Sequence, residues 1–322
     1  SKAGEPVTAE DLKAAGAMAV LLKDALKPNL LQTLEGTPAL IHTGPFGNIA
    51  TGNSSVVADQ VGSRTGDYLI TEAGFAADMG AERFFNVKCR ATGLTPDAAV
   101  VVVTVRALKA HSDRFEVKVG KELPPEMLTE GPADVEAGAG NLRKHIEIIQ
   151  SFGVQPVVAI NAFPTDHESE HEVIRRVATE AGARVAVSTH VADGGEGARE
   201  LARAVAEACE DEVTFTPTYE LTDSLETKLE KIATSVYGAD GVDIAPAAAK
   251  ALARYTERGY GDLPVLIAKT QMSLSHDPTL KGVPTGWRLP IREVRLAAGA
   301  GYVYALAGSM DVDLNNDPLG QD

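Results

Sequence analysis

The sequence GVQPVVAINAFPTD, residues 153–166, joins a short apolar run to a polar turn. The run at residues 157–160 is uncharged and rich in β-branched side chains, which is typical of a strand covered on both faces of a parallel sheet. Sheets of this kind occur almost only in α/β proteins, where helices cover both faces. The stretch therefore predicts an α/β protein built around a buried strand.

The turn that follows this strand carries groups suited to holding a flat heterocycle. Pro164 disfavours helical backbone at the residue before it, and the spacing from Thr165 to Glu168 is that of a capping box, so a helix is predicted from about residue 166. Open α/β sheets bind ligands at the carboxyl ends of their strands. The side chains expected at this edge are Asn161, Phe163 and Asp166. An ordinary strand-to-helix turn with a half-buried phenyl ring is an equally simple interpretation.

The rest of the chain alternates strand patterns with helix patterns. Further strands are predicted at residues 37–42, 67–71, 98–105, 183–189, 263–269, 289–296 and 301–306. Helices are predicted at residues 9–25, 54–64, 141–152, 166–181, 220–237 and 246–258, with another from just after residue 197 to about 210. Residues 112–138 read as a long irregular connection. The predicted fold class is α/β, with a doubly wound, mostly parallel sheet and a smaller C-terminal α/β portion.

Composition excludes several classes of function. The 322 residues carry 30 basic and 45 acidic side chains, and a formal charge of −15 argues against nucleic-acid binding. The two cysteines, Cys89 and Cys209, are too few for a disulfide framework, and no Cys/His pair stands at zinc spacing, so no metal site is predicted. The longest apolar run, residues 98–103, is too short to span a membrane, and no secretory signal is recognised. A cytoplasmic protein is expected.

Other segments are expected near the same sheet edge. Phe75, in a loop after the predicted strand at residues 67–71, could stack on a ring, although aromatic side chains at such spacing are more often core. Three cations follow strands and could bind an anion or pair with acidic side chains: Arg106, Lys109 and Lys269. Glycines at a helix start free backbone N–H groups to face a ligand, which singles out residues 194–197. A glycine-rich loop at residues 44–55 matches no phosphate-binding pattern.

Several motifs together resemble the formate–tetrahydrofolate ligase family. They appear in family order over nearly the whole chain as GPFGNIATGNSSV (44–56), TEAGFAADMGAERFFNVKCR (71–90), TVRALKAH (104–111), AINAFPTD (159–166), ADGGEG (192–197), YGADGV (237–242) and KTQMSLSHDPTLKGVPTG (269–286). The resemblance implies a P-loop NTPase-like core. It also implies an enzyme that joins formate to the N10 nitrogen of tetrahydrofolate, using ATP with Mg²⁺, through formyl phosphate.

The resemblance also implies site residues. For the folate ring these are Glu72, Gly74, Phe75 and the position of Val191. For the nucleotide they are Asn161, Phe163, Pro164, Asp166, Gly194, Gly195 and Gly197.

Three departures from the family pattern limit what is expected of this chain. The family's glycine-rich phosphate loop has no counterpart here, Val191 stands where the family has a folate-stacking tryptophan, and the TMPGLP segment is missing after Met310. The chain alone is therefore expected to show no catalytic turnover. Residues 1–64 are expected to complete a preceding domain, residues 65–220 to form a central domain with the base- and folate-contacting loops, and residues 221–322 to form a C-terminal domain.

Three alternatives remain open from the sequence. The chain could be a non-catalytic homologue that binds a folate or a nucleotide, a subunit of a split ligase whose partner chain carries the P-loop, or a sequence from which segments are omitted. A homo-oligomer is also compatible with the family.

Overall fold

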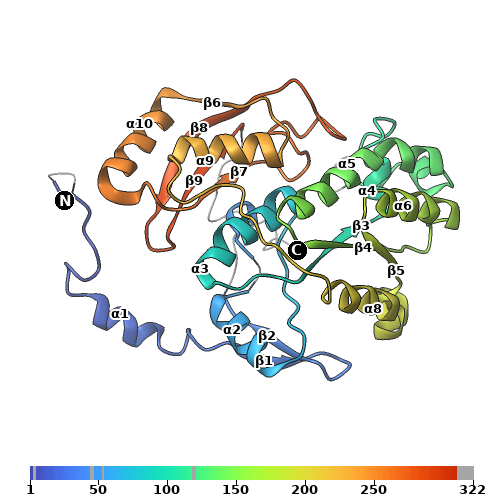
Figure 1. The fold of residues 1–322 in the computed structure, drawn as a ribbon, viewed down its shortest axis with the longest axis horizontal. Helices are drawn as coiled ribbons and strands as arrows, with labels where there is room; N and C mark the ends of the chain where they lie inside the picture. Colours follow the sequence, from blue (N-terminus) through green and yellow to red (C-terminus); the bar gives the residue numbers. More distant parts are fainter. Residues whose placement is uncertain (3–4, 44–46, 53, 118–120, 310–322) are drawn as a thin grey trace. The chain divides into compact units, whose positions relative to one another are not determined.

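The computed structural model describes residues 1–2, 5–43, 47–52, 54–117 and 121–309 (Figure 1). The chain forms two compact units, the first comprising residues 1–45 and 53–72 and the second residues 46–52 and 73–322. The domain limits expected at residues 64 and 220 stay predictions. Across the described ranges, no helix is both long enough and apolar enough to cross a membrane. Residues 310–322, and residues 44–46 and 53 of the glycine-rich loop, lie outside the described residues.

The first unit is small and keeps many apolar side chains exposed. Its elements are helix α1 (Ala15–Leu22), the antiparallel strands β1 (Asn29–Gln32) and β2 (Pro38–Ile41), and helix α2 (Val56–Thr65). The helix expected at residues 9–25 is shorter because Lys13 adopts a positive φ of 57° just before it. None of the residues of α1 is buried, and Leu21 is 83% exposed. Residues 67–71 form no strand, so that prediction is wrong, and Ile70 is 87% exposed there.

The second unit contains a three-stranded parallel sheet in the order β3-β4-β5. Its strands are β3 (Ala98–Val103), β4 (Gln155–Asn161) and β5 (Arg184–Ser188), as the apolar runs predict. The helices beside it are α4 (Val105–Ala110), α5 (Pro132–Ser151), α6 (Glu168–Glu180) and α8 (Arg199–Ala208). Helices α5 and α6 cover one face and α8 covers the other (Figure 1). This arrangement confirms the α/β class.

The starts of helices α5 and α6 differ from the predictions. Helix α5 begins at Pro132 inside the stretch expected to be irregular, because Pro132 occupies the first turn and Gly138 lets the helix approach the backbone of α4. A Cβ atom on Gly138 would lie 1.9 Å from the carbonyl oxygen of Leu108. Helix α6 begins at Glu168, and its capping box joins His167 to Glu170. The capping box expected two residues earlier is therefore wrong.

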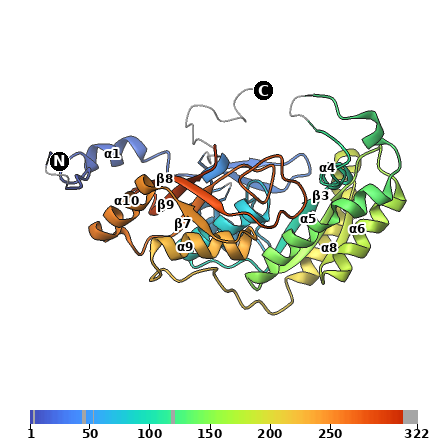
Figure 2. The same cartoon turned by 90° about the horizontal axis from the view of Figure 1, so that it is seen from above.

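A second, mixed sheet has the order β6-β8-β9-β7. Its strands are β6 (Val242–Ile244), which the sequence did not reveal, β7 (Val265–Ala268), β8 (Leu289–Ala297) and β9 (Tyr302–Ala307). Strands β8 and β9 lie where strands were predicted, and they pair antiparallel. Helices α9 (Leu225–Lys231) and α10 (Pro246–Tyr255) pack against this sheet, and each continues into a π-helical turn, η6 (Ile232–Val236) and η7 (Thr256–Tyr260) (Figure 2).

The two sheets of the second unit share one hydrophobic core. Phe85 and Phe152 pack with ring centroids 4.7 Å apart and belong to the same cluster as Leu225 and Val265. The buried hydroxyl of Tyr219 donates a hydrogen bond to the carbonyl oxygen of Val265 at 3.1 Å and accepts one from its N–H at 3.0 Å. The parallel sheet and the mixed sheet are thus joined by side chains as well as by the chain.

Candidate functional site

The carboxyl ends of β3, β4 and β5 lie at one edge of the parallel sheet. The register pairs Val103 with Ile160 and Asn161 with Ser188. The segments that leave these strands contain the cations after β3, the turn after β4 and the glycines after β5. The predicted shared edge is confirmed for these three segments.

Arg106 and Phe163 stack on each other at this edge. The guanidinium carbon of Arg106 lies 3.9 Å from the centroid of the Phe163 ring, and its Nη2 donates to the hydroxyl of Thr165 at 3.2 Å. A cation stacked on an aromatic face makes a planar, partly apolar surface. Within the described ranges, no hydrogen bond reaches the half-buried side-chain amide of Asn161, which leaves that amide able to bind a ligand.

Asp166 holds the turn in shape. Its side chain is 2% exposed, and its Oδ2 accepts a hydrogen bond from the N–H of Phe163 at 2.9 Å. The carbonyl oxygen of Phe163 accepts in return from the N–H of Asp166 at 2.9 Å. The Nε2 atom of His171 lies 3.4 Å from the same carboxylate oxygen. The carboxylate therefore holds the backbone from which the Phe163 ring projects.

Phe75 stands in a strained turn of the second unit. Its φ is 67°, a left-handed value that is uncommon for a bulky residue, and its side chain is 46% exposed. Strain of this kind clusters at functional sites. The turn packs closely on Gly80, where a Cβ atom would lie 1.9 Å from the carbonyl oxygen of Gly74. Glu72, the last residue of the first unit, precedes this turn.

Gly80→Ala is expected to displace this turn, because backbone atoms cannot yield to a new methyl group as a flexible side chain can. If the turn holds a folate ring, the affinity for tetrahydrofolate should fall about tenfold or more, measured by calorimetry. Gly140→Ala is the matched control: it lies inside α5, where a Cβ atom meets only a Val283 methyl at 3.7 Å. Equal affinities for both variants would contradict the role of the turn.

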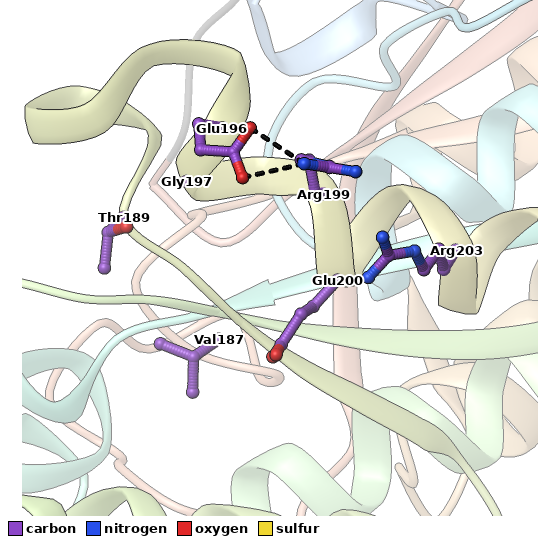
Figure 3. A pocket seen from close by; sticks show the side chains of 7 residues that line it. All are labelled: Val187, Thr189, Glu196, Gly197, Arg199, Glu200 and Arg203. Atoms are coloured by element: carbon purple, nitrogen blue, oxygen red, sulfur yellow. Dashed lines mark hydrogen bonds and ion pairs between the residues drawn. The ribbon is translucent and has the colours of Figure 1, made fainter.

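Of the three glycines after β5, Gly197 lines a shallow hollow of about 340 Å³, and Gly194 and Gly195 do not (Figure 3). Gly194 to Ala198 form a 3₁₀ turn, and the carbonyl oxygen of Gly197 accepts a hydrogen bond from the N–H of Thr189 at 3.0 Å. Figure 3 shows the Glu196 carboxylate facing the guanidinium of Arg199, whose Nη1 lies 2.9 Å from Oε1. Neither Phe75 nor Phe163 lines this hollow. Val191, in the short helix α7 (His190–Asp193), is 81% exposed.

Comparisons with known proteins decide the family. The sequence model of the family "Formate--tetrahydrofolate ligase" matches residues 1–313. The chain belongs to this family. It is 66% identical to the formate–tetrahydrofolate ligase of Cutibacterium acnes over 99% of this chain and 60% of the relative. It is 64% identical to that of Saccharopolyspora erythraea, over 95% of this chain and 54% of the relative. The chain thus spans little more than half the length of these relatives.

Two of the three cations that could bind an anion are instead paired with acidic side chains and backbone carbonyl oxygens of the same chain. The ammonium group of Lys109 lies 2.5 Å from Oε1 of Glu170 and donates to two backbone carbonyl oxygens, at 3.0 and 2.7 Å. Lys269 lies 2.6 Å from Oδ2 of Asp78 and also donates to two carbonyl oxygens, at 3.1 and 2.6 Å. Both side chains are buried and use all three donors. Of the three candidates, only Arg106 remains partly exposed.

Sequence reasoning missed a cluster of buried ionisable side chains beside the Phe75 turn. Asp78 pairs with Lys269, whose Nζ lies 5.0 Å from the centroid of the Tyr237 ring. Glu82 and Arg83, adjacent in sequence, are both fully buried, and Nη2 of Arg83 donates to the carbonyl oxygen of Ile267 at 2.7 Å. Burial raises the pKa of Glu82 to about 7, although the hydrogen bond from Asn86 opposes the shift. The only signal in the sequence is the presence of Asp78, Glu82 and Arg83 within six residues.

Proposed function

We propose that this chain forms the ring-binding part of a formate–tetrahydrofolate ligase, which joins formate to tetrahydrofolate at the expense of ATP. The observation that carries the proposal is the Arg106–Phe163 stack, held by Asp166 in the turn that follows Asn161 at the carboxyl edge of a parallel sheet. Family membership supplies the reaction, and the stack supplies a surface for a flat ring.

We assign the ring-binding roles by segment. The nucleotide base is bound by the turn after β4 and the glycines after β5, which comprise Asn161, Phe163, Pro164, Asp166, Gly194, Gly195 and Gly197. The folate ring is bound by the strained turn and the segment before the glycines, which comprise Glu72, Gly74, Phe75 and Val191. Asp166 acts by positioning, because its carboxylate is buried and already bonded within the turn.

The phosphate groups of ATP and its Mg²⁺ have no fitting site among the residues that the structure describes. Lys109 and Lys269 have no free donor, and no group of three acidic, histidine or cysteine side chains within the described ranges could hold a metal ion. The groups that contact phosphate are therefore proposed to come from family sequence outside this chain, as in a P-loop NTPase-like core completed by a further segment. Without them the chain alone should produce no 10-formyltetrahydrofolate.

A second candidate function is a non-catalytic folate- or nucleotide-binding protein, or one subunit of a split ligase. The occupied lysines and the exposed Val191 favour this alternative. Formation of 10-formyltetrahydrofolate from formate, ATP and tetrahydrofolate by the purified chain would refute the claim that the phosphate-contacting groups lie elsewhere.

Phe163→Ala tests the ring-binding surface directly. Losing an aromatic stacking partner costs about 1 kcal/mol, so the affinity for ATP should fall about fivefold in calorimetry, with tetrahydrofolate measured separately. Phe115→Ala is the matched control, because Arg114 also lies over that ring, 5.0 Å from its centroid, in a different part of the chain. A loss confined to tetrahydrofolate would move Phe163 from the nucleotide to the folate. Unchanged affinity for both ligands would contradict the site.

A further inference from the structure

Lys269 is a buried cation whose position is fixed from several sides. It directly follows strand β7, all four residues of which are buried, and its own side chain is 0% exposed. Its ammonium group has three acceptors, namely Oδ2 of Asp78 at 2.6 Å and the carbonyl oxygens of Thr270 and Ser273 at 3.1 and 2.6 Å. Because a lysine has three donors, each of them is used, and the ammonium group has little freedom to move.

Asp78, the charged partner of Lys269, lies in the segment that follows the Phe75 turn. It belongs to the π-helical turn η2 (Ala77–Ala81), which begins two residues after Phe75. Asp78 is 4% exposed, and its neighbour Met79 is fully buried. The contact between Lys269 and Asp78 therefore joins the end of strand β7 to a segment that lies only three residues from Phe75.

The Phe75 turn needs an anchor of this kind because its backbone is strained. A bulky residue with a φ of 67° keeps this conformation only where the surrounding structure holds it. The close approach of Gly80 to the carbonyl oxygen of Gly74 places η2 directly against the turn. A displacement of η2 would therefore be passed on to Phe75.

We propose that Lys269 is a positioning residue for the folate ring: through Asp78 it holds the Phe75 turn in the conformation that binds the ring, without touching the ligand itself. The proposal rests on the proposed function, which assigns this turn to the folate. It gives Lys269 a role other than anion binding, which its occupied donors do not allow.

The second buried lysine provides a matched comparison. Lys109 also has one carboxylate partner, Glu170, and two carbonyl acceptors. It lies in α4, the helix that carries Arg106, so its loss should disturb the stack on Phe163. The two buried lysines are thus expected to support different ligands.

The test is calorimetry on Lys269→Met and Lys109→Met with tetrahydrofolate and ATP separately, at a temperature at which circular dichroism shows both variants folded. Lys269→Met should lower the affinity for tetrahydrofolate about tenfold and leave that for ATP unchanged. Lys109→Met should lower the affinity for ATP and leave that for tetrahydrofolate unchanged. A general loss of stability would instead weaken both ligands in both variants. Lys250→Met removes an exposed lysine and should change neither affinity.

Asp78→Asn provides a second variant should Lys269→Met not fold. Its amide oxygen can still accept a hydrogen bond from Lys269, but the ion pair is lost, so the affinity for tetrahydrofolate should fall less, by about threefold. Without ligand, the backbone amides of residues 75–82 should exchange with deuterium faster in either variant than in the parent chain.

Three outcomes separate this inference from the proposed function. Unchanged affinity for tetrahydrofolate in both variants, or equal losses for tetrahydrofolate and ATP, would overturn the positioning role alone. A parent chain that binds no tetrahydrofolate would refute the assignment of the turn to the folate. Unchanged hydrogen exchange at residues 75–82 would overturn the positioning role in that case too.

Discussion

Lys109→Met is expected to lower the free energy of unfolding by about 3–5 kcal/mol, because it leaves the carboxylate of Glu170 buried without its cation. The Lys109 and Glu170 side chains are 2% and 0% exposed, so water cannot replace the lost partner. The substitution also frees the carbonyl oxygens of Met127 and Thr129. Urea titration followed by circular dichroism measures the change. Since this pair holds α4 against α6, the Arg106–Phe163 stack should loosen as well.

Two variants control this experiment. Lys231→Met breaks a more exposed pair with Asp223 and should cost no more than about 1 kcal/mol. The double variant Lys109→Met, Glu170→Gln removes both buried charges and should recover part of the loss. If the two single losses simply add in the double variant, the pair does not act as a coupled unit.

Glu82→Gln is expected to stabilise the protein at pH 8 by about 3 kcal/mol and to leave its stability at pH 4 nearly unchanged. Burial raises the pKa of this carboxyl to about 7 from an ordinary value of 4.5. Between these values the folded protein keeps a proton that the unfolded chain releases, so stability falls as the pH rises through this window. Glutamine has no proton to lose, and it retains an oxygen to accept the hydrogen bond that Asn86 donates at 2.7 Å.

The difference between variant and parent isolates Glu82 from other titrating groups. His111, whose pKa burial lowers to about 4, changes stability in the opposite direction between pH 4 and 6.5, but it does so equally in both proteins. Exposed Glu257→Gln serves as the control and should shift stability by less than about 0.5 kcal/mol at either pH. Parallel stability curves for Glu82→Gln and its parent would contradict the raised pKa.

Apolar runs predicted the strands well because burial on both faces leaves a strong compositional signal. β3 and β5 lie within the predicted ranges, and β4 contains the apolar run at residues 157–160 and extends beyond it at both ends. Element boundaries were less predictable where tertiary contacts decide them. The start of α5 depends on how closely Gly138 approaches Leu108, and the cap of α6 depends on how Asp166 closes the preceding turn. Neither contact is visible from sequence spacing.

The sequence predicts at which edge of the sheet the candidate site lies, but not which charged side chains pair with one another there. Parallel strand order brings Arg106 and Phe163 to one rim, which the sequence predicts from the strand ends alone. The partners of Lys109 and Lys269 are 61 and 191 residues away, so the sequence could not identify them and left both anion binding and pairing with acidic side chains open. The close contact between Gly80 and Gly74 was not predictable either. The only sign of such a close backbone approach in a sequence is a small residue.

The double hydrogen bond between the Tyr219 hydroxyl and Val265 bears on how the protein can be dissected. Cutting the chain after residue 220 would separate the rings of Phe85 and Phe152 from side chains that bury them. It would also remove the strand to which Tyr219 is hydrogen-bonded. Neither fragment would then contain a complete hydrophobic core. Residues 73–309 should therefore melt in one cooperative step, and a limited protease should find no stable product ending near residue 220.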